Sequence, residues 1–156
     1  ANKRALGNGP PFLKLKGIIR YPIDAFETYL NKNLQNFEYS KIITEGDSEI
    51  NLEIINKTSM KETNNISRKL YISSSYEINN TSRSATGKIE SYRTVIKVKL
   101  ETKDKNDKVI QSKNFLKKLT YNSKDNNYEL VEYQNFLKND LVNKIINEII
   151  VYLNSQ

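Results

Sequence analysis

The chain has 156 residues, a length that corresponds to one domain with a single hydrophobic core. It contains neither cysteine nor histidine, which excludes disulfides, thiol nucleophiles, thiolate metal sites and the commonest general base. The net charge is +7, and residues 88–124 hold eleven cations against four anions while the rest of the chain is neutral. A lysine-rich composition alone could produce this charge but not its location, which favours a surface that faces an anionic partner.

The N-terminal residues give three weak signals. Residues 1–11 are rich in glycine, proline and asparagine and lack periodicity, which predicts a flexible leader or linker. Residues 13–20 give a weak strand signal, in which Leu13, Leu15, Gly17 and Ile19 alternate with Lys14, Lys16, Ile18 and Arg20. Asp24 and Glu27 loosely match a capping box, and the apolar residues that follow at helical spacing predict an amphipathic helix over 24–37.

The next segments predict strands, with one ambiguity. Residues 37–44 could form a short strand, and 70–78 alternate as a half-buried strand does. Between them, Asp47 or Ser48 could cap a helix, yet the isoleucines and leucine over 50–54 alternate as in a strand. Periodicity does not decide between these two structures.

A long basic hairpin follows, with turn-forming residues and Gly87 at its tip. On the strand over 92–100, the residues from Tyr92 to Leu100 at even positions form the inward face, while Arg93, Val95, Lys97 and Lys99 face outward. Residues 102–108 form a connection to a returning strand over 109–121. There Lys113 and Lys117 share a parity with apolar residues, which predicts a bulge or a strand with two different environments.

The C-terminal residues 128–153 carry the longest helical signal, with an apolar stripe wider than about 100°. Such a stripe covers a sheet plus a partner, or lies deep in the protein's own core. Strands between helices predict an α+β fold, a two-layer sandwich. Its antiparallel sheet of about four strands would be packed on one face by an N-terminal helix and a long C-terminal helix.

Motifs for catalysis and cofactors are absent from the sequence. There is no phosphate-binding or dinucleotide-binding glycine motif and no nucleophile elbow. The acidic residues over 45–49 fit no known cation loop. We therefore expect no enzyme, no cofactor and no metal site.

The basic hairpin permits two kinds of ligand. Its lysines and nearby aromatic residues could form a nucleic-acid surface, although no recognised RNA-binding or helix-turn-helix motif accompanies them. Cations beside apolar residues such as Val95 and Phe115 also suit an amphiphile with a phosphorylated head and acyl tails. Composition does not choose between them.

Several strings resemble the lipopolysaccharide-assembly lipoprotein LptE of α-proteobacterial type, as does the order of the elements from about residue 36 onward. The strings are "ITEGDSEIN", "SSSYEINNTSRSATGKIESYR" and "KNFLKKLTYNSKDNNYELVEYQNFLKNDLVNKIINEIIVYL". The resemblance implies that 48–60 form the first helix and that 36–156 form an LptE-like domain. Residues 1–35 would then be an N-terminal extension, unless the helix over 24–37 is the family's first helix.

The resemblance also implies a non-catalytic function. LptE proteins lie at the periplasmic face of the outer membrane, anchored by a lipidated cysteine, bind lipopolysaccharide and plug the LptD barrel. On this basis we expect LptD and lipopolysaccharide as partners, no nucleic acid, and a lipid anchor that is absent from this cysteine-free sequence.

The expected lipopolysaccharide-binding residues lie along the basic hairpin. Lys113 matches a basic position of the family, whereas Ala85 stands where a second basic residue is expected. Arg83 and Lys88 flank that position and could substitute for it. The full set of expected lipopolysaccharide-binding residues is Arg83, Lys88, Arg93, Lys113, Lys117 and Lys118. A structural assembly subunit, whose charge only aids solubility, is a further alternative.

Overall fold

The computed structural model describes residues 13–15, 18–20 and 37–155. The chain divides into two units, residues 1–35 and 36–156, and each is described by itself. In the first, β1 (Leu13–Leu15) and β2 (Ile18–Arg20) form an antiparallel pair where a single strand was predicted. The predicted helix over 24–37 lies outside the described residues, apart from Phe37, which begins a strand.

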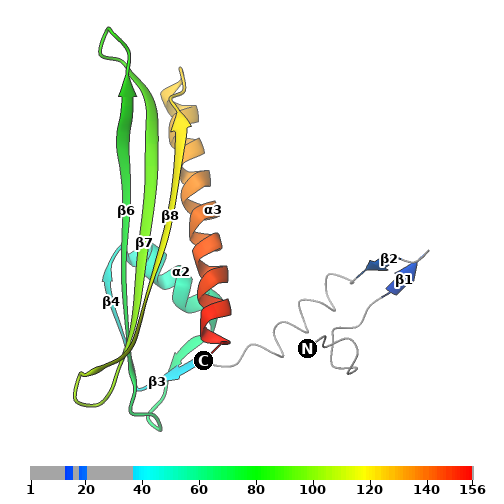
Figure 1. Cartoon of the computed structure of the whole chain (residues 1–156), viewed down its shortest axis with the longest axis vertical. Coiled ribbons are helices and arrows are strands. Elements are labelled where there is room, and N and C mark those ends of the chain that lie inside the picture. The colour runs from blue at the N-terminus through cyan, green and yellow to red at the C-terminus, as the bar shows by residue number, and fades with distance from the viewer. Residues whose placement is uncertain (1–12, 16–17, 21–36, 156) are drawn as a thin grey trace. The chain divides into compact units, whose positions relative to one another are not determined.

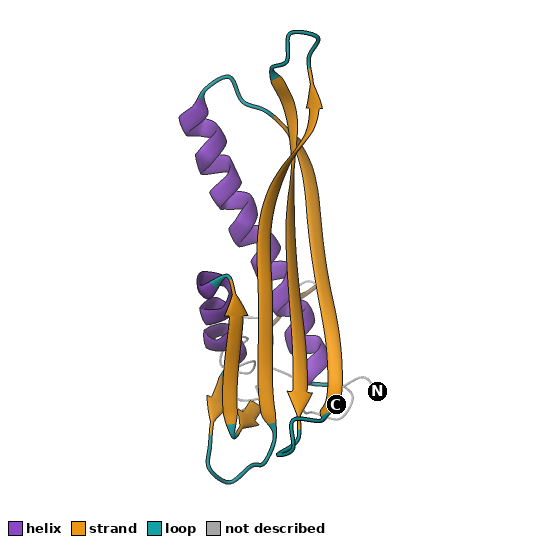
Figure 2. Ribbon diagram, turned by 90° about the vertical axis from the view of Figure 1, so that its left-hand side faces the viewer, coloured by secondary structure: helices purple, strands orange, loops and turns teal. Residues whose placement is uncertain are grey.

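The second unit has two layers, as predicted. A four-stranded sheet in the order β4-β6-β7-β8 is covered on one face by two helices (Figures 1 and 2). Its strands are β4 (Lys41–Gly46), β6 (Lys69–Arg83), β7 (Ile89–Lys103) and β8 (Val109–Asn122). The helices are α2 (Ser48–Thr58) and α3 (Asn127–Leu153). The α+β fold class is therefore confirmed.

The sheet is antiparallel in its three long strands, but β4 runs parallel to β6. A parallel pair requires a crossover connection, and α2 supplies it between the two strands. The residues beside this crossover form a small parallel pair, β3 (Phe37–Tyr39) with β5 (Met60–Glu62). The strand predicted over 37–44 is thus two strands, β3 and β4, in two different sheets.

The ambiguous segment is a helix, as the family resemblance implied. Asp47 caps α2 by accepting a hydrogen bond from the Ile50 amide at 3.0 Å. Ile50 and Ile54 are buried against the sheet, whereas Leu52 is 60% exposed. The apparent alternation was misleading because Leu52 lies on the solvent side of the helix.

The long hairpins follow the predicted parity. Thr94, Ile96, Val98 and Leu100 are buried on the helix side of β7, while Arg93 is exposed on the other side. The register shift between β7 and β8 lies at Thr102 and Lys103, near the start of β8. From residue 113 to 121 the pairing is regular. The imperfect pattern of β8 therefore reflects two environments and not a local bulge.

The wide apolar stripe of α3 is buried on two sides within the chain. One side packs on the sheet, and the other meets α2, where Lys57 donates to Asn143 at 2.7 Å. The buried residues of α3 are Leu130, Leu137, Leu141, Val142, Ile145, Ile146 and Ile149. No described helix is both long enough and apolar enough to cross a membrane.

Candidate functional site

One face of the four-stranded sheet is left uncovered by the two described helices. Side chains alternate across a sheet, so the residues between the buried positions of the long strands share this surface, which we call the open face. The cross-strand register places Ser73, Lys99 and Asn114 in one row, and Ser75, Lys97 and Leu116 in the next. The other members used below are Tyr71, Glu77, Arg93, Val95, Glu101, Lys103, Lys118 and Thr120.

The centre of the open face is hollowed. Serines at 73 and 75 leave space beside the longer Lys97, Lys99 and Leu116, and the hollow has a volume of about 440 Å³. Its lining combines hydroxyl groups, ammonium groups and apolar atoms. A ligand that carries both anionic and apolar groups would therefore find partners for each.

Charge is divided between the two layers. The three long strands β6, β7 and β8 carry nine cations and three anions, whereas α2 and α3 together carry three cations and six anions. The sheet layer is thus positive and the helix layer negative. An anionic ligand would be attracted to the open face and not to the helices.

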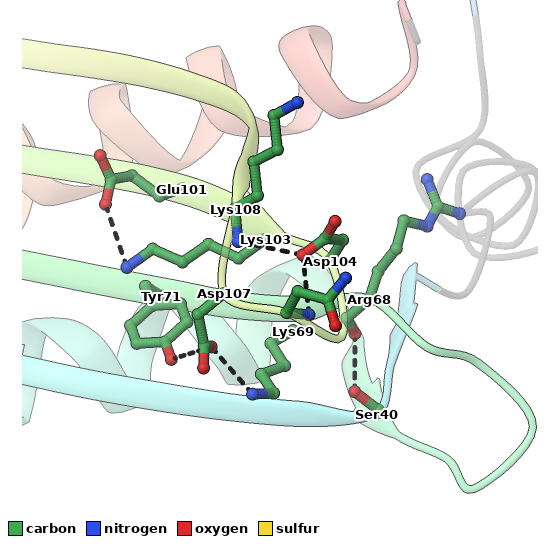
Figure 3. A network of polar contacts seen from close by, with 10 residues as sticks. Ser40, Arg68, Lys69, Tyr71, Glu101, Lys103, Asp104, Asp107 and Lys108 are labelled. Carbon is green, nitrogen blue, oxygen red and sulfur yellow. Dashed lines mark hydrogen bonds and ion pairs between the residues drawn. The ribbon is translucent and has the colours of Figure 1, made fainter.

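At the end of the open face nearest the β7–β8 turn, which we call its lower end, the cations already have partners (Figure 3). Lys69 and the Tyr71 hydroxyl both donate to Asp107, at 2.8 and 3.2 Å. The hydrogen bond from Lys69, followed by that from Tyr71, lowers the pKa of Asp107. Lys103 lies 3.9 Å from the centre of the Tyr71 ring. These contacts compete with any external anion.

The middle of the open face is also partly neutralised. Lys99 pairs with Glu101 at 2.5 Å, and this hydrogen bond is the main reason that the pKa of Glu101 is lowered. Lys97 lies 3.7 Å from Glu77, a longer and weaker contact. Exposed pairs of this kind contribute only about 0–1 kcal/mol, so a phosphate could displace them.

The upper part of the open face is the end nearer the β6–β7 turn. It differs because its cations, Arg93 and Lys118, have no carboxylate partner among the described residues. The Arg93 Nε donates to the Thr120 hydroxyl at 3.1 Å, and Lys118 stands opposite Val95. Arg93 and Lys118 are therefore diagonal neighbours on adjacent strands, and positions of this kind are about 7–8 Å apart. Val95 and the nearby Leu116 add apolar surface to this pair.

The structure does not bring the six predicted residues into one cluster. Arg93 and Lys118 share the open face, but Lys113 and Lys117 lie on the opposite side of β8, beside α3. Lys117 pairs with Glu148, and the Lys113 ammonium lies 6.0 Å from the centre of the Tyr152 ring.

The two remaining predicted residues lie at the β6–β7 tip. Arg83 donates to the Gly87 carbonyl at 2.9 Å, and Lys88 lies 3.4 Å from Asp125. Sequence reasoning had no signal for the hollow at Ser73 and Ser75, because parity within a strand does not give the register between strands.

Within the described part of the chain, no group of acidic residues is arranged to hold a metal ion. The aromatic residues predicted near the basic hairpin are not on the open face. Tyr92 and Tyr121 stack on each other at 5.9 Å, and Tyr121 meets Tyr133 of α3 at 5.6 Å. These rings form a small second core under the helix.

No protein-family model and no curated protein sequence matches the chain. Solved structures do share its fold. Rare lipoprotein B from Shewanella oneidensis aligns with a TM-score of 0.53 at 12% identity, over 74% of this chain and 94% of that protein. Lipoprotein B from Nitrosomonas europaea aligns at 0.50 with 14% identity, over 74% and 84% of the two chains.

A minor lipoprotein from Acinetobacter baumannii is also similar, with a TM-score of 0.50 at 10% identity over 73% of this chain and 90% of that protein. At such low identity the similarity concerns the fold alone. The chain thus has the fold of bacterial lipoproteins of the rare lipoprotein B type.

Proposed function

We propose that the chain is a non-catalytic lipopolysaccharide-assembly protein, which binds lipopolysaccharide through the upper part of the open face. The observation that carries this proposal is the pair Arg93 and Lys118, which lack carboxylate partners among the described residues and lie beside Val95 and Leu116. Phosphates of a glycolipid head accept charge-assisted hydrogen bonds from such cations, and its acyl chains need apolar surface.

The proposal includes a lipid-anchored location at the periplasmic face of the outer membrane and the LptD barrel as partner. The fold shared with solved lipoproteins supports the anchored location. Exposed apolar residues on the outer side of α3 offer a surface for a barrel wall. They are Tyr128, Val131 and Phe136, of which the two aromatic residues are more than 60% exposed.

A nucleic-acid-binding function has less support. Single-stranded nucleic acids are bound by aromatic residues that stack on bases beside basic residues. On the described open face the aromatic residue is Tyr71, whose ring is already covered by Lys103. Tyr92 and Tyr121 lie on the helix side of the sheet.

The test is the binding of fluorescent lipid A by charge-reversal variants. Arg93→Glu and Lys118→Glu should each weaken binding about tenfold or more, because hydrogen bonds to charged groups contribute about 1.5–3 kcal/mol. Lys61→Glu makes the same charge change at an exposed position of β5 and should leave the affinity within about twofold. Unfolding curves would establish that every variant is folded.

Two further probes separate the alternatives. Lipid A without its phosphates should bind more weakly than lipid A to the unaltered protein. Its affinity for Arg93→Glu should equal its affinity for the unaltered protein. Single-stranded RNA should be released at physiological salt, since its binding would depend mainly on phosphate contacts. Equal lipid A affinity in all variants would refute the open-face site, and retained RNA without lipid binding would favour a nucleic-acid module.

A further inference from the structure

The hollow of about 440 Å³ in the open face lies between two rows of side chains, each with a serine on β6 and a lysine on β7. The row between them, Ser74, Val98 and Phe115, is buried on the helix side, so the sheet backbone forms the floor of the hollow. Because serine side chains are short, the space above β6 stays open.

The ammonium groups of the two lysines are drawn to opposite ends of the hollow. Lys97 lies 3.7 Å from Glu77, which belongs to the next row toward the β6–β7 turn. Lys99 pairs at 2.5 Å with Glu101, which belongs to the next row toward the β7–β8 turn. The charges are thus held apart, and the CH₂ stems of the two lysines border the space between them.

The rest of the lining is apolar or neutral. Leu116, which is 54% exposed, forms the wall on β8. Ser73, Ser75 and Asn114 contribute uncharged polar groups. A phosphate in the hollow would first have to displace the two ion pairs, whereas an alkyl chain meets a suitable surface without any rearrangement. The lining therefore favours an uncharged, apolar occupant.

The hollow is continuous with the cation pair at the upper part of the open face. Leu116 borders both, since it lines the hollow and lies one row from Lys118. Arg93 precedes Lys97 by four residues on β7, a separation of about 13 Å along a strand. Cations at one end and an uncharged hollow at the other match the two parts of a single amphiphile.

We propose that the hollow binds one acyl chain of an amphiphile whose phosphate is held by Arg93 and Lys118. This inference rests on the proposed function, from which it takes the phosphate site, and adds a defined place for the chain. The Ser75 hydroxyl would donate a hydrogen bond to the carbonyl that links chain and head. The chain would then run past Leu116 and over Ser73, and its length would determine the affinity.

The experiment compares dodecyl phosphate with hexyl phosphate, each added to the full chain below its critical micelle concentration and followed by isothermal titration calorimetry. Each buried CH₂ group strengthens binding about fourfold. Because the hollow is open to solvent on one side, we expect dodecyl phosphate to bind at least tenfold more tightly overall. Isotope-filtered NMR should show contacts between its CH₂ protons and the methyl groups of Leu116.

Variants separate the chain site from the phosphate site. Ser75→Gln places a larger uncharged side chain in the hollow and should reduce the ratio of the two affinities at least fivefold. Ser112→Gln is the matched control, because Ser112 is an exposed residue of the same face that does not line the hollow. It should leave the ratio within about twofold. Arg93→Glu should weaken both alkyl phosphates by similar factors.

The outcomes distinguish the two proposals. Equal affinity for the two alkyl phosphates, a ratio unchanged by Ser75→Gln, or NMR contacts to Val131 of α3 in place of Leu116 would each overturn the acyl-chain site, even where Arg93→Glu weakens binding. An unchanged ratio is also the result expected if a protein segment fills the hollow. Affinities that do not respond to Arg93→Glu would instead refute the phosphate site of the proposed function.

Discussion

At the scale of single residues, Gly46, between β4 and α2, has no space for a side chain, whereas Gly87 does. Both have positive φ, 89° and 84°. A Cβ atom at position 46 would lie 1.8 Å from the backbone oxygen of Ser74, whereas one at position 87 would meet nothing within 4 Å. The same Ser74 oxygen accepts a hydrogen bond from the Asp47 amide at 3.2 Å. The turn into α2 is therefore pressed against β6.

We predict that Gly46→Ala lowers the free energy of unfolding by at least about 2 kcal/mol, because the methyl group forces the β4–α2 turn away from β6. Gly87→Ala should cost about 1 kcal/mol, since it carries the strain of the positive φ without a steric clash. Urea unfolding followed by circular dichroism measures both. Equal losses in the two variants would contradict the close contact at Ser74.

At the scale of elements, Lys138 holds α3 to the start of α2 and to β6. Its side chain is only 15% exposed and contacts Glu49 at 2.5 Å and Asp47 at 3.5 Å. Its ammonium also lies 5.1 Å from the centre of the Tyr76 ring. Burial opposes its charge, but the hydrogen bond to Glu49 and the charge of Asp47 outweigh this and raise the pKa of Lys138.

We predict that Lys138→Ala lowers the free energy of unfolding by about 1–3 kcal/mol, because it leaves the part-buried Asp47 without its cation. Lys144→Ala is the control, since Lys144 forms an exposed pair with Asp140 within α3. Such a pair is worth about 0.3–0.5 kcal/mol. Urea and thermal unfolding should show a clearly larger loss of stability for Lys138→Ala than for Lys144→Ala. Similar losses in the two variants would mean that Lys138 does not stabilise the packing of α3 on α2 and β6.

At the scale of the whole molecule, residues 36–156 form a two-layer unit whose layers carry opposite charge. The helices bury one face of the sheet and leave the other, positive face uncovered among the described residues. This arrangement separates two tasks. The helix layer supplies the core and the exposed apolar residues of α3, while the open face carries the cations that we propose for ligand binding.

Much of this unit could be predicted from the sequence. The parity of Arg93 and Ile96 and the amphipathic stripe of α3 follow from local periodicity, which the structure confirms. The parallel placement of β4 could not be predicted, because it depends on which strands become neighbours. The identity of α2 came from the family resemblance, since Leu52 made its pattern resemble a strand.

The candidate site was predictable only in part. Periodicity placed Arg93 on an outward face, but it did not show that Lys118 is its neighbour across β8. Parity placed Lys113 and Lys117 on the same side of β8 as apolar residues, but it could not show that this side faces α3, where Glu148 neutralises Lys117. These facts depend on strand register and on helix packing, which join residues distant in sequence.

The central claim is that the open face binds a phosphorylated glycolipid, and an NMR titration of the isotope-labelled chain with lipid A in detergent micelles tests it most directly. Empty micelles give the reference spectrum. The largest lipid-dependent shifts should fall on Ser75, Arg93, Val95, Leu116 and Lys118. Shifts concentrated instead on the exposed residues Tyr128, Val131 and Phe136 of α3, with the open face unchanged, would contradict the account.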